Sequence, residues 1–310
     1  MMMPKITETL NRLRLGEAQT HQNMTLYPLH GANGHPRGYL TLEEALEQGQ
    51  FQVTEVSEGG SVPVLAVQNQ GELPVLLVVG EELVGSKQNR VLNTSLLVPA
   101  QATTQIPVSC VEQGRWRYTS RTFSASPTTA HLKLRRMSVH NVTASLNTDR
   151  QFDAKQGEVW GEVSRKMASH AAYSNTGALR DVYEQTETSL RHYVEAFQAP
   201  ASEGMLVVIN QMVVGVDLFD HAETLQRLFG KLLRGYALDA LEQAGATPGE
   251  VAPEVATPQH FLAVIQQAQE ERYPSAGVGE DVRLTHPHLT GSALLWEGRA
   301  VHVSVFNAQA

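Results

Sequence analysis

The chain of 310 residues has very little cysteine and no long apolar segment. Cys110 is its only cysteine, so no intrachain disulfide can form, which is typical of a reducing compartment. Residues 1–8 lack the continuous apolar stretch that a secretory signal requires. No apolar run approaches the ~20 residues that cross a membrane. We therefore expect a cytoplasmic protein without membrane association.

An excess of basic side chains is also missing. Lys and Arg together number 24 against 32 Asp and Glu, and the formal net charge is −8. This balance argues against a nucleic-acid-binding protein, whose affinity comes from neutralising phosphates. It is compatible with one small phosphorylated ligand, because a pocket can be basic within an acidic surface. The sequence indicates no particular oligomeric state.

The common catalytic signatures are absent as well. The chain has no Walker A motif, Rossmann glycine fingerprint, HExxH motif or nucleophile elbow. His286-Pro287-His288 supplies two candidate metal ligands, but the sequence offers no third ligand nearby. We therefore expect no metal site, and no pattern identifies a cofactor.

What is present predicts a globular α+β fold, because the hydrophobic fraction of 42% is enough to bury a core. Short β-branched segments between residues 26 and 111 predict strands, and Thr41 with Glu44 predicts a capping box on one helix among them. Apolar residues at helical spacing predict helices within residues 154–199. A strand signal at 205–209 is followed by two helices and a strand pair. We predict a β-rich N-terminal half, central helices and a C-terminal mixed α/β unit.

Residues 121–153 carry many Ser, Thr and Arg residues and show no clear apolar period, so they are predicted to form a long loop. The chain is then a single domain, 1–310, or two lobes joined by that loop. The lobes would be a β-rich one, 15–120, and a helical and mixed α/β one, 154–310.

The most polar segment of the chain is residues 80–93. A strand enters it, Gly85-Ser86 supplies a turn, and the chain returns to a strand at Val91, which predicts a hairpin with Glu82 near Arg90. Carboxylates accept from hydroxyls, amides both donate and accept, and Lys or Arg binds phosphate. On spacing alone, a solvated hairpin tip with a surface ion pair is the more common explanation. The candidate residues are Glu81, Glu82, Lys87, Gln88, Asn89, Arg90 and Asn93.

A second polar segment follows the strand that contains Ile106 and Cys110. These two residues lie on one face by the period of two, so Cys110 is interpreted as a small core residue. Glu112, Gln113, Arg115 and Trp116 come after the strand end, where a loop can present them to a ligand. Trp116 could stack on a base or a sugar, or could simply pack against the protein.

The third candidate is Asp217, between the strand at 205–209 and the following helix. Asp220 is explained as the N-cap of that helix. Asp217 has no such explanation, so it is a candidate general base, ribose-hydroxyl acceptor or metal ligand.

Five segments together resemble one prokaryotic family. They are GEELVGSKQNRVLN at 80–93, IPVSCVEQGRW at 106–116, GEVW at 157–160, GVDLFD at 215–220 and YALDA at 236–240. They are similar to the ARG and rhodanese-phosphatase-superfamily-associated protein domain, over nearly the whole chain. The resemblance implies an association with ADP-ribosylglycohydrolases, rhodaneses and phosphatases, and hence a ligand derived from ADP-ribose or NAD.

The resemblance also implies that the three candidate segments form one pocket. In this pocket Glu81, Glu82 and Asp217 would be catalytic, and the remaining candidates would bind the ligand. We expect either a protein that binds or processes such a nucleotide, as a hydrolase if it is an enzyme, or a non-catalytic module. That module would sense a ligand or bind a protein, with the charged hairpin as a structural element.

Overall fold

The structure, a computed structural model, describes residues 6–31, 36–246 and 252–310. The chain divides into two compact units. The first comprises Met1–Arg37, Ser189–Tyr273 and Gly279–Ala310, and the second comprises Gly38–Thr188 and Pro274–Val278. Both units combine helices with sheets, so the fold class is α+β, as predicted.

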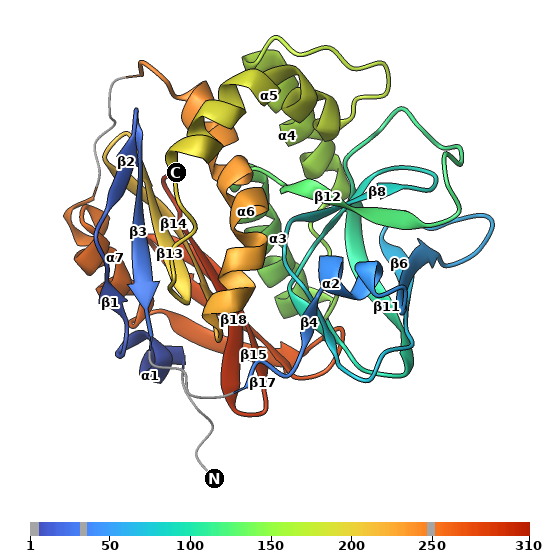
Figure 1. Ribbon diagram of the computed structural model, residues 1–310, viewed down its shortest axis with the longest axis horizontal. Coiled ribbons are helices and arrows are strands. Elements are labelled where there is room, and N and C mark those ends of the chain that lie inside the picture. The colour runs from blue at the N-terminus through green and yellow to red at the C-terminus, as the bar shows by residue number, and fades with distance from the viewer. Residues whose placement is uncertain (1–5, 32–35, 247–251) are drawn as a thin grey trace. The chain divides into compact units, whose positions relative to one another are not determined.

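The first unit is built on a nine-stranded sheet with the order β1-β3-β13-β14-β18-β17-β16-β15, in which β2 also pairs with β3 (Figure 1). The N-terminal strands belong here because β3 pairs along its length with β13, placing Leu26 opposite Val207. The strands are β1 (Arg14–Leu15), β2 (Gln19–His21), β3 (Met24–His30), β13 (Gly204–Ile209), β14 (Met212–Phe219), β15 (Gln269–Pro274), β16 (Glu280–His286), β17 (Leu289–Trp296) and β18 (Arg299–Asn307).

Helices cover both faces of this sheet. Val216 and Val305 contribute to an apolar core on the face covered by α1 (Ile6–Leu10), the short helix η1 (Pro253–Val255) and α7 (Pro258–Ile265). The other face packs against α6 (Ala222–Glu242), which contacts β13 and β14 (Figure 1).

The start of α6 differs from the prediction by one residue. Its N-cap is His221, whose Nδ1 accepts the Glu223 N–H at 3.3 Å, rather than Asp220. Asp220 instead forms an ion pair with Arg299, with 3.3 Å between Oδ2 and Nε. An imidazole nitrogen can satisfy a helical N–H as a carboxylate does, but His is not among the preferred N-cap residues.

The second unit contains a six-stranded sheet in the order β12-β8-β9-β11-β6-β5. The end strands β12 and β5 also contact each other, so the sheet curls into a barrel-like form. A three-stranded sheet, β10-β7-β4, packs on the same apolar core. The strands are β4 (Leu40–Thr41), β5 (Phe51–Glu55), β6 (Val64–Asn69), β7 (Val75–Leu77), β8 (Glu81–Gly85), β9 (Arg90–Leu92), β10 (Leu96–Val98), β11 (Ala102–Cys110) and β12 (Phe123–Thr129).

The helices of the second unit are α2 (Leu42–Glu47), α3 (Leu132–Thr148), α4 (Gln156–Ser169) and the first part of α5 (Leu179–Ala196). The capping box is present on α2, because the Thr41 N–H donates to the Glu44 carboxylate at 2.8 Å. The two helices predicted within 154–199 are also present, as α4 and α5.

The prediction of a long loop at 121–153 is wrong, because β12 and α3 occupy most of this segment. The cause is the polar character of the buried face of α3, which includes Arg135, Ser138 and Asn141. Asn141 is satisfied there by donating to the Ala154 carbonyl at 3.1 Å and to Glu158 at 2.7 Å. Such polar residues interrupt the helical spacing of the buried apolar residues Leu132, Val139, Val142 and Leu146 and weaken the signal.

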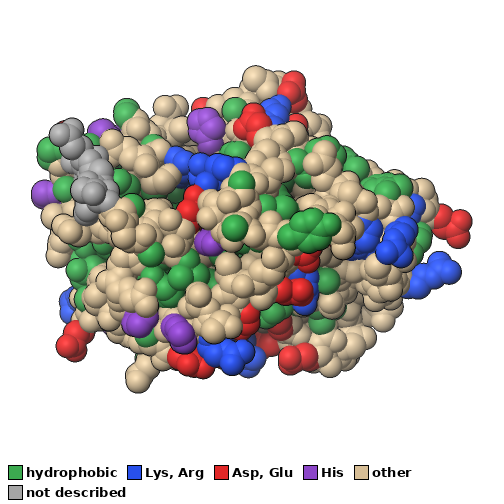
Figure 2. Space-filling view, turned by 90° about the horizontal axis from the view of Figure 1, so that it is seen from above, with side chains coloured by type: hydrophobic (Ala, Val, Ile, Leu, Met, Phe, Trp, Pro, Cys, Tyr) green, Lys and Arg blue, Asp and Glu red, His purple; other side chains and the backbone are tan. Residues whose placement is uncertain are grey.

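The two units also do not follow the two lobes expected from the sequence. The N-terminal strands β1, β2 and β3 join the C-terminal strands in one sheet, and residues 154–188 belong with the β-rich unit. Across the described ranges, no helix is both long and apolar enough to cross a membrane. On the face shown in Figure 2, Lys and Arg side chains are interspersed with Asp and Glu and do not form one continuous basic surface.

Candidate functional site

The inward-facing side chains of the curled sheet change from apolar to polar at one end. Along β5 the buried inward series is Phe51, Val53 and Glu55. Arg90 shares the inward face of β9 with Leu92, which belongs to the apolar core, because side chains two residues apart lie on the same face. Cys110, opposite Arg90 in the ladder, ends the inward series of β11. A buried carboxylate, guanidinium and thiol therefore face the same end of the sheet.

The segment 80–93 does form a hairpin, but its register differs from the prediction. Arg90 pairs with Leu83, and Glu82 pairs with Val91. A shift of one residue places side chains on opposite faces. Glu82 and Arg90 consequently do not form the ion pair that the sequence suggested.

The hairpin tip is buried rather than solvated. Lys87, Gln88 and Asn89 are at most 9% exposed. Arg115 holds the tip by donating to the Ser86 carbonyl at 2.7 Å, the Asn89 Oδ1 at 3.1 Å and the Glu112 carboxylate at 2.6 Å. The surface-tip interpretation therefore fails.

Glu112 completes this clasp. Its carboxylate accepts from the Asn89 N–H at 3.1 Å and from the Thr176 hydroxyl at 2.9 Å, in addition to Arg115. Burial by itself raises the pKa of Glu112, but these hydrogen bonds outweigh it and hold the pKa below its ordinary value. The hydrogen-bonding groups of Glu112, Arg115 and Asn89 thus stabilise the folded tip.

Arg90, in contrast, retains unused hydrogen-bonding capacity. Its side chain is 0% exposed, and only one terminal nitrogen is satisfied, by the Gln88 carbonyl and amide oxygens at 3.1 Å. Nε and Nη2 are buried without a partner among the described residues. Burial lowers the pKa of Arg90 from its ordinary value, and the neighbouring Cys110 and Glu55 act in the opposite direction. Buried unpaired polar groups are rare and costly in folded proteins.

Glu55, which the sequence analysis did not identify, has an unused acceptor where Arg90 has unused donors. One carboxylate oxygen accepts from the Ser86 hydroxyl at 3.1 Å and from the Lys87 N–H at 3.3 Å. The other, Oε2, is buried without a partner in the described part of the chain. No ion pair joins Glu55 to Arg90 among the described residues. The signal that could have found Glu55 is its position two residues beyond Val53 on an inward strand face.

Lys87 and two half-exposed aromatic residues cover this end of the sheet. The Lys87 ammonium lies 5.2 Å from the ring centre of Trp116 and 5.0 Å from that of Tyr118. The guanidinium carbon of Arg90 lies 5.7 Å from the same Trp116 ring. These are cation–π distances. We call Glu55, Lys87, Arg90 and Trp116 the barrel-end site.

Glu81 and Glu82 do not belong to the barrel-end site. Glu81 lies at the opposite end of β8 from the tip, where its carboxylate accepts the Val78 N–H at 2.6 Å. Glu82 points to the outer face, where Ser126 and Thr128 donate to Oε2 at 2.7 and 3.2 Å. Its Oε1 is buried without a partner within the described ranges, and burial raises its pKa.

The remaining candidates of the second unit have structural hydrogen bonds or are exposed. Asn93 donates to the Phe152 carbonyl at 2.8 Å and accepts from Ser109. Gln88 donates to the Glu112 carbonyl at 2.9 Å. Gln113 is exposed. Cys110 is buried, as predicted, and burial raises the pKa of its thiol.

Asp217 belongs to the first unit, on the face of the sheet that α6 covers. Its fully buried carboxylate accepts from the Tyr236 hydroxyl at 2.8 Å and the Ser304 hydroxyl at 3.0 Å, and His302 Nε2 lies 3.3 Å away. These partners all belong to the same unit. The shared pocket of Asp217 with the hairpin residues stays a prediction.

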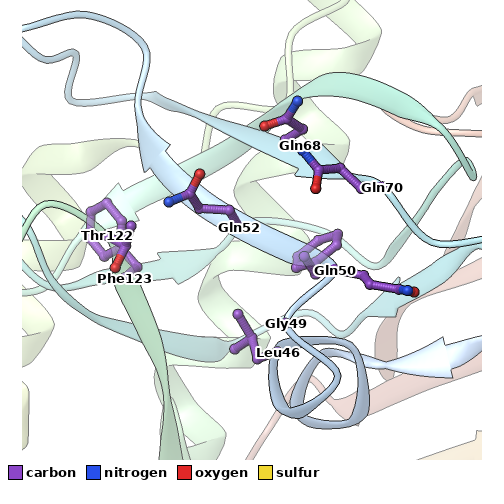
Figure 3. A pocket seen from close by; sticks show the side chains of 9 residues that line it. Leu46, Gly49, Gln50, Gln52, Gln68, Gln70, Thr122 and Phe123 are labelled. Atoms are coloured by element: carbon purple, nitrogen blue, oxygen red, sulfur yellow. The ribbon is translucent and has the colours of Figure 1, made fainter.

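A pocket of about 280 Å³ lies elsewhere in the second unit (Figure 3). Its lining carries no charged side chain and consists of Leu46, Gly49, Gln50, Phe51, Gln52, Gln68, Gln70, Thr122 and Phe123. None of the predicted site residues lines it. Across residues 6–31, 36–246 and 252–310, no group of three or more His, Cys, Asp or Glu side chains is arranged to hold a metal ion.

Comparison with known proteins places the chain in one family. No curated protein and no solved structure shows a significant match to it. One family model, the ARG and Rhodanese-Phosphatase-superfamily-associated Protein domain, matches residues 12–306. Because this match covers nearly the full length, the chain belongs to the family of the ARG and Rhodanese-Phosphatase-superfamily-associated Protein domain.

Proposed function

We propose that the barrel-end site binds a phosphorylated nucleotide derived from ADP-ribose or NAD. The observation that carries the proposal is Arg90, a fully buried guanidinium whose Nε and Nη2 have no partner among the described residues. These two groups are neighbouring donors of the planar fork that binds phosphate oxygens in a bidentate manner. Buried donors without partners destabilise the folded protein. They are expected at sites where a ligand supplies the missing acceptors.

The surroundings of Arg90 support a nucleotide in particular. Lys87 adds a second positive charge near the same Trp116 ring, and this ring, 47% exposed, offers a surface on which a base can stack. This ring lies at cation–π distance from both Arg90 and Lys87. A ligand would draw the ring from the cations to its base, with a stacking energy of about 1–3 kcal/mol. The family description, which names ARG and rhodanese-phosphatase proteins, is consistent with an ADP-ribose-related ligand.

Binding is the function that the geometry supports best. Of the carboxylates proposed as catalytic, Glu81 lies at the far end of β8 and Glu82 points to the outer face, so neither is part of the barrel-end site. Hydrolysis would need a carboxylate within hydrogen-bond reach of the reacting group. Glu55 is the carboxylate that faces this end of the sheet.

The test is thermal denaturation with ADP-ribose, NAD or AMP, followed by calorimetric titration of any ligand that stabilises. A ligand at 100 times its Kd adds about 2.7 kcal/mol of stability. Arg90→Lys keeps the charge but loses the fork, so we expect at least tenfold weaker binding. Arg121→Gln, at an exposed arginine of the same unit, is the control. If no nucleotide at millimolar concentration raises the melting temperature, the proposal is wrong.

A further inference from the structure

We propose that Glu55 is a ligand-binding residue of the barrel-end site and makes that site selective for ligands that present hydroxyl donors next to their phosphates, such as the ribose diol of a nucleotide. This inference rests on the proposed function, since it concerns the same ligand. It adds a residue and a selectivity that the sequence did not indicate.

The first argument is the difference in hydrogen bonding between the two oxygens of the Glu55 carboxylate. Oε1 anchors the hairpin tip through the Ser86 hydroxyl and the Lys87 N–H. Oε2 has no partner among the described residues, although the side chain is only 9% exposed. Anchoring the tip therefore explains one oxygen and leaves the other unused. An ionised carboxylate can only accept, so Oε2 requires a donor.

The second argument is the set of side chains that surround Oε2. A Cβ atom placed on Gly60 would lie 3.3 Å from Oε2 and 3.3 Å from Cζ2 of Trp116. It would also lie 3.1 Å from Cδ of Lys87. Three members of the site thus close around Gly60, where even a methyl group would be in tight contact. A ligand hydroxyl reaches Oε2 when the Lys87 side chain or the exposed Trp116 ring moves aside. Gly60 also has a φ of +74°, which L residues rarely adopt.

The third argument is the charge pattern. Glu55 and Arg90 face the same end of the sheet with opposite charges and unused atoms, yet they do not pair with each other in the described structure. A phosphate satisfies Arg90 but is repelled by Glu55. A neutral sugar satisfies Glu55 but leaves Arg90 unpaired. A molecule that carries phosphate and adjacent hydroxyls satisfies both, and carboxylates bind ribose hydroxyls in this way in dinucleotide sites.

The experiment compares ADP-ribose with inorganic pyrophosphate by calorimetric titration of the wild type and three variants. Glu55→Gln keeps an acceptor for Ser86 and Lys87 but turns the unused oxygen into a donor. Glu55→Asp keeps the charge and shortens its reach, and serves if the amide variant does not fold. Glu58→Gln, at an exposed residue of the following loop, is the matched control.

We expect Glu55→Gln and Glu55→Asp to weaken ADP-ribose binding at least tenfold, with pyrophosphate binding unchanged or tighter. Equal weakening of both ligands would show that Glu55 acts through the hairpin tip and would overturn the inference. Unchanged ADP-ribose affinity in both Glu55 variants, together with loss of affinity in Arg90→Lys, would overturn the inference while leaving the proposed function intact. A wild type that binds neither ligand would refute both.

Discussion

Replacing Glu81 by Gln is expected to change how the stability of the protein depends on pH. Glu81 is fully buried, and burial raises its pKa from 4.5 to about 8 despite the Val78 hydrogen bond and the charge of Arg135. Between these two values the folded chain keeps the carboxyl proton and the unfolded chain does not. The contribution of this proton to stability is therefore complete below about pH 4.5 and is lost as the pH rises to about 8.

The magnitude follows from the two pKa values. One pKa unit corresponds to about 1.4 kcal/mol, so a rise from 4.5 to about 8 amounts to about 5 kcal/mol of unfolding free energy. The amide of the Glu81→Gln variant does not titrate. The unfolding free energy of the variant minus that of the wild type should therefore grow by about 1.4 kcal/mol for each pH unit between about pH 5 and about pH 8.

The assay is urea unfolding followed by circular dichroism at several pH values between about 5 and about 9. Glu72→Gln, at an exposed glutamate of the same unit, supplies the control, and its profile should run parallel to that of the wild type. Parallel profiles for Glu81→Gln as well would refute the reasoning. They would mean that Arg135 and the Val78 N–H keep Glu81 ionised in the folded state.

Three further outcomes can be measured directly. Gly60→Ala should lower the unfolding free energy by about 1 kcal/mol, because residue 60 has a positive φ. It should also alter Trp116 fluorescence, since the new methyl group contacts that ring. An unchanged spectrum would contradict the packing of Trp116 against residue 60. Asp217→Asn should cost about 2–4 kcal/mol in urea unfolding, because an amide cannot accept all the hydrogen bonds that the carboxylate accepts; a loss below about 0.5 kcal/mol would refute this. Cys110 should react with a thiol reagent at pH 8 only after urea is added, because burial shields the thiol and raises its pKa; rapid native-state labelling would argue against its place in the core.

Local rules predicted much of the fold. The capping box of α2, the helices α4 and α5, and the strand β13 follow from patterns within a few residues. Helix α3 did not, because buried polar residues such as Ser138 and Asn141 interrupt its apolar spacing. The burial of Asn141 is explained by its hydrogen bond to Glu158, and such a tertiary partner cannot be identified from local sequence.

For the candidate site, the sequence predicted the hairpin, which is present, but not the faces of its strands. It placed Arg90 near Glu82, whereas the register places Arg90 opposite Leu83. The tip is four residues long, and such a loop leaves the register undecided by one residue, which reverses every face. Glu55 was missed for a different reason. It lies in another strand, and only the curl of the sheet brings β5 to the tip.

The pairing of β3 with β13 has a consequence for how the chain is made. Leu29 cannot pair with Gly204 until the ribosome has synthesised the segment between them. At 5–20 residues per second this takes on the order of ten seconds or more. During that time most of the second unit, Gly38–Thr188, can fold as a nearly continuous piece, while β1, β2 and β3 remain an unmatched strand edge. In the nascent chain the exposed edge of β1, β2 and β3 is therefore made first, and the second unit can fold before β13 covers that edge. Newly made chains stalled before Gly204 should be the form that most needs a chaperone.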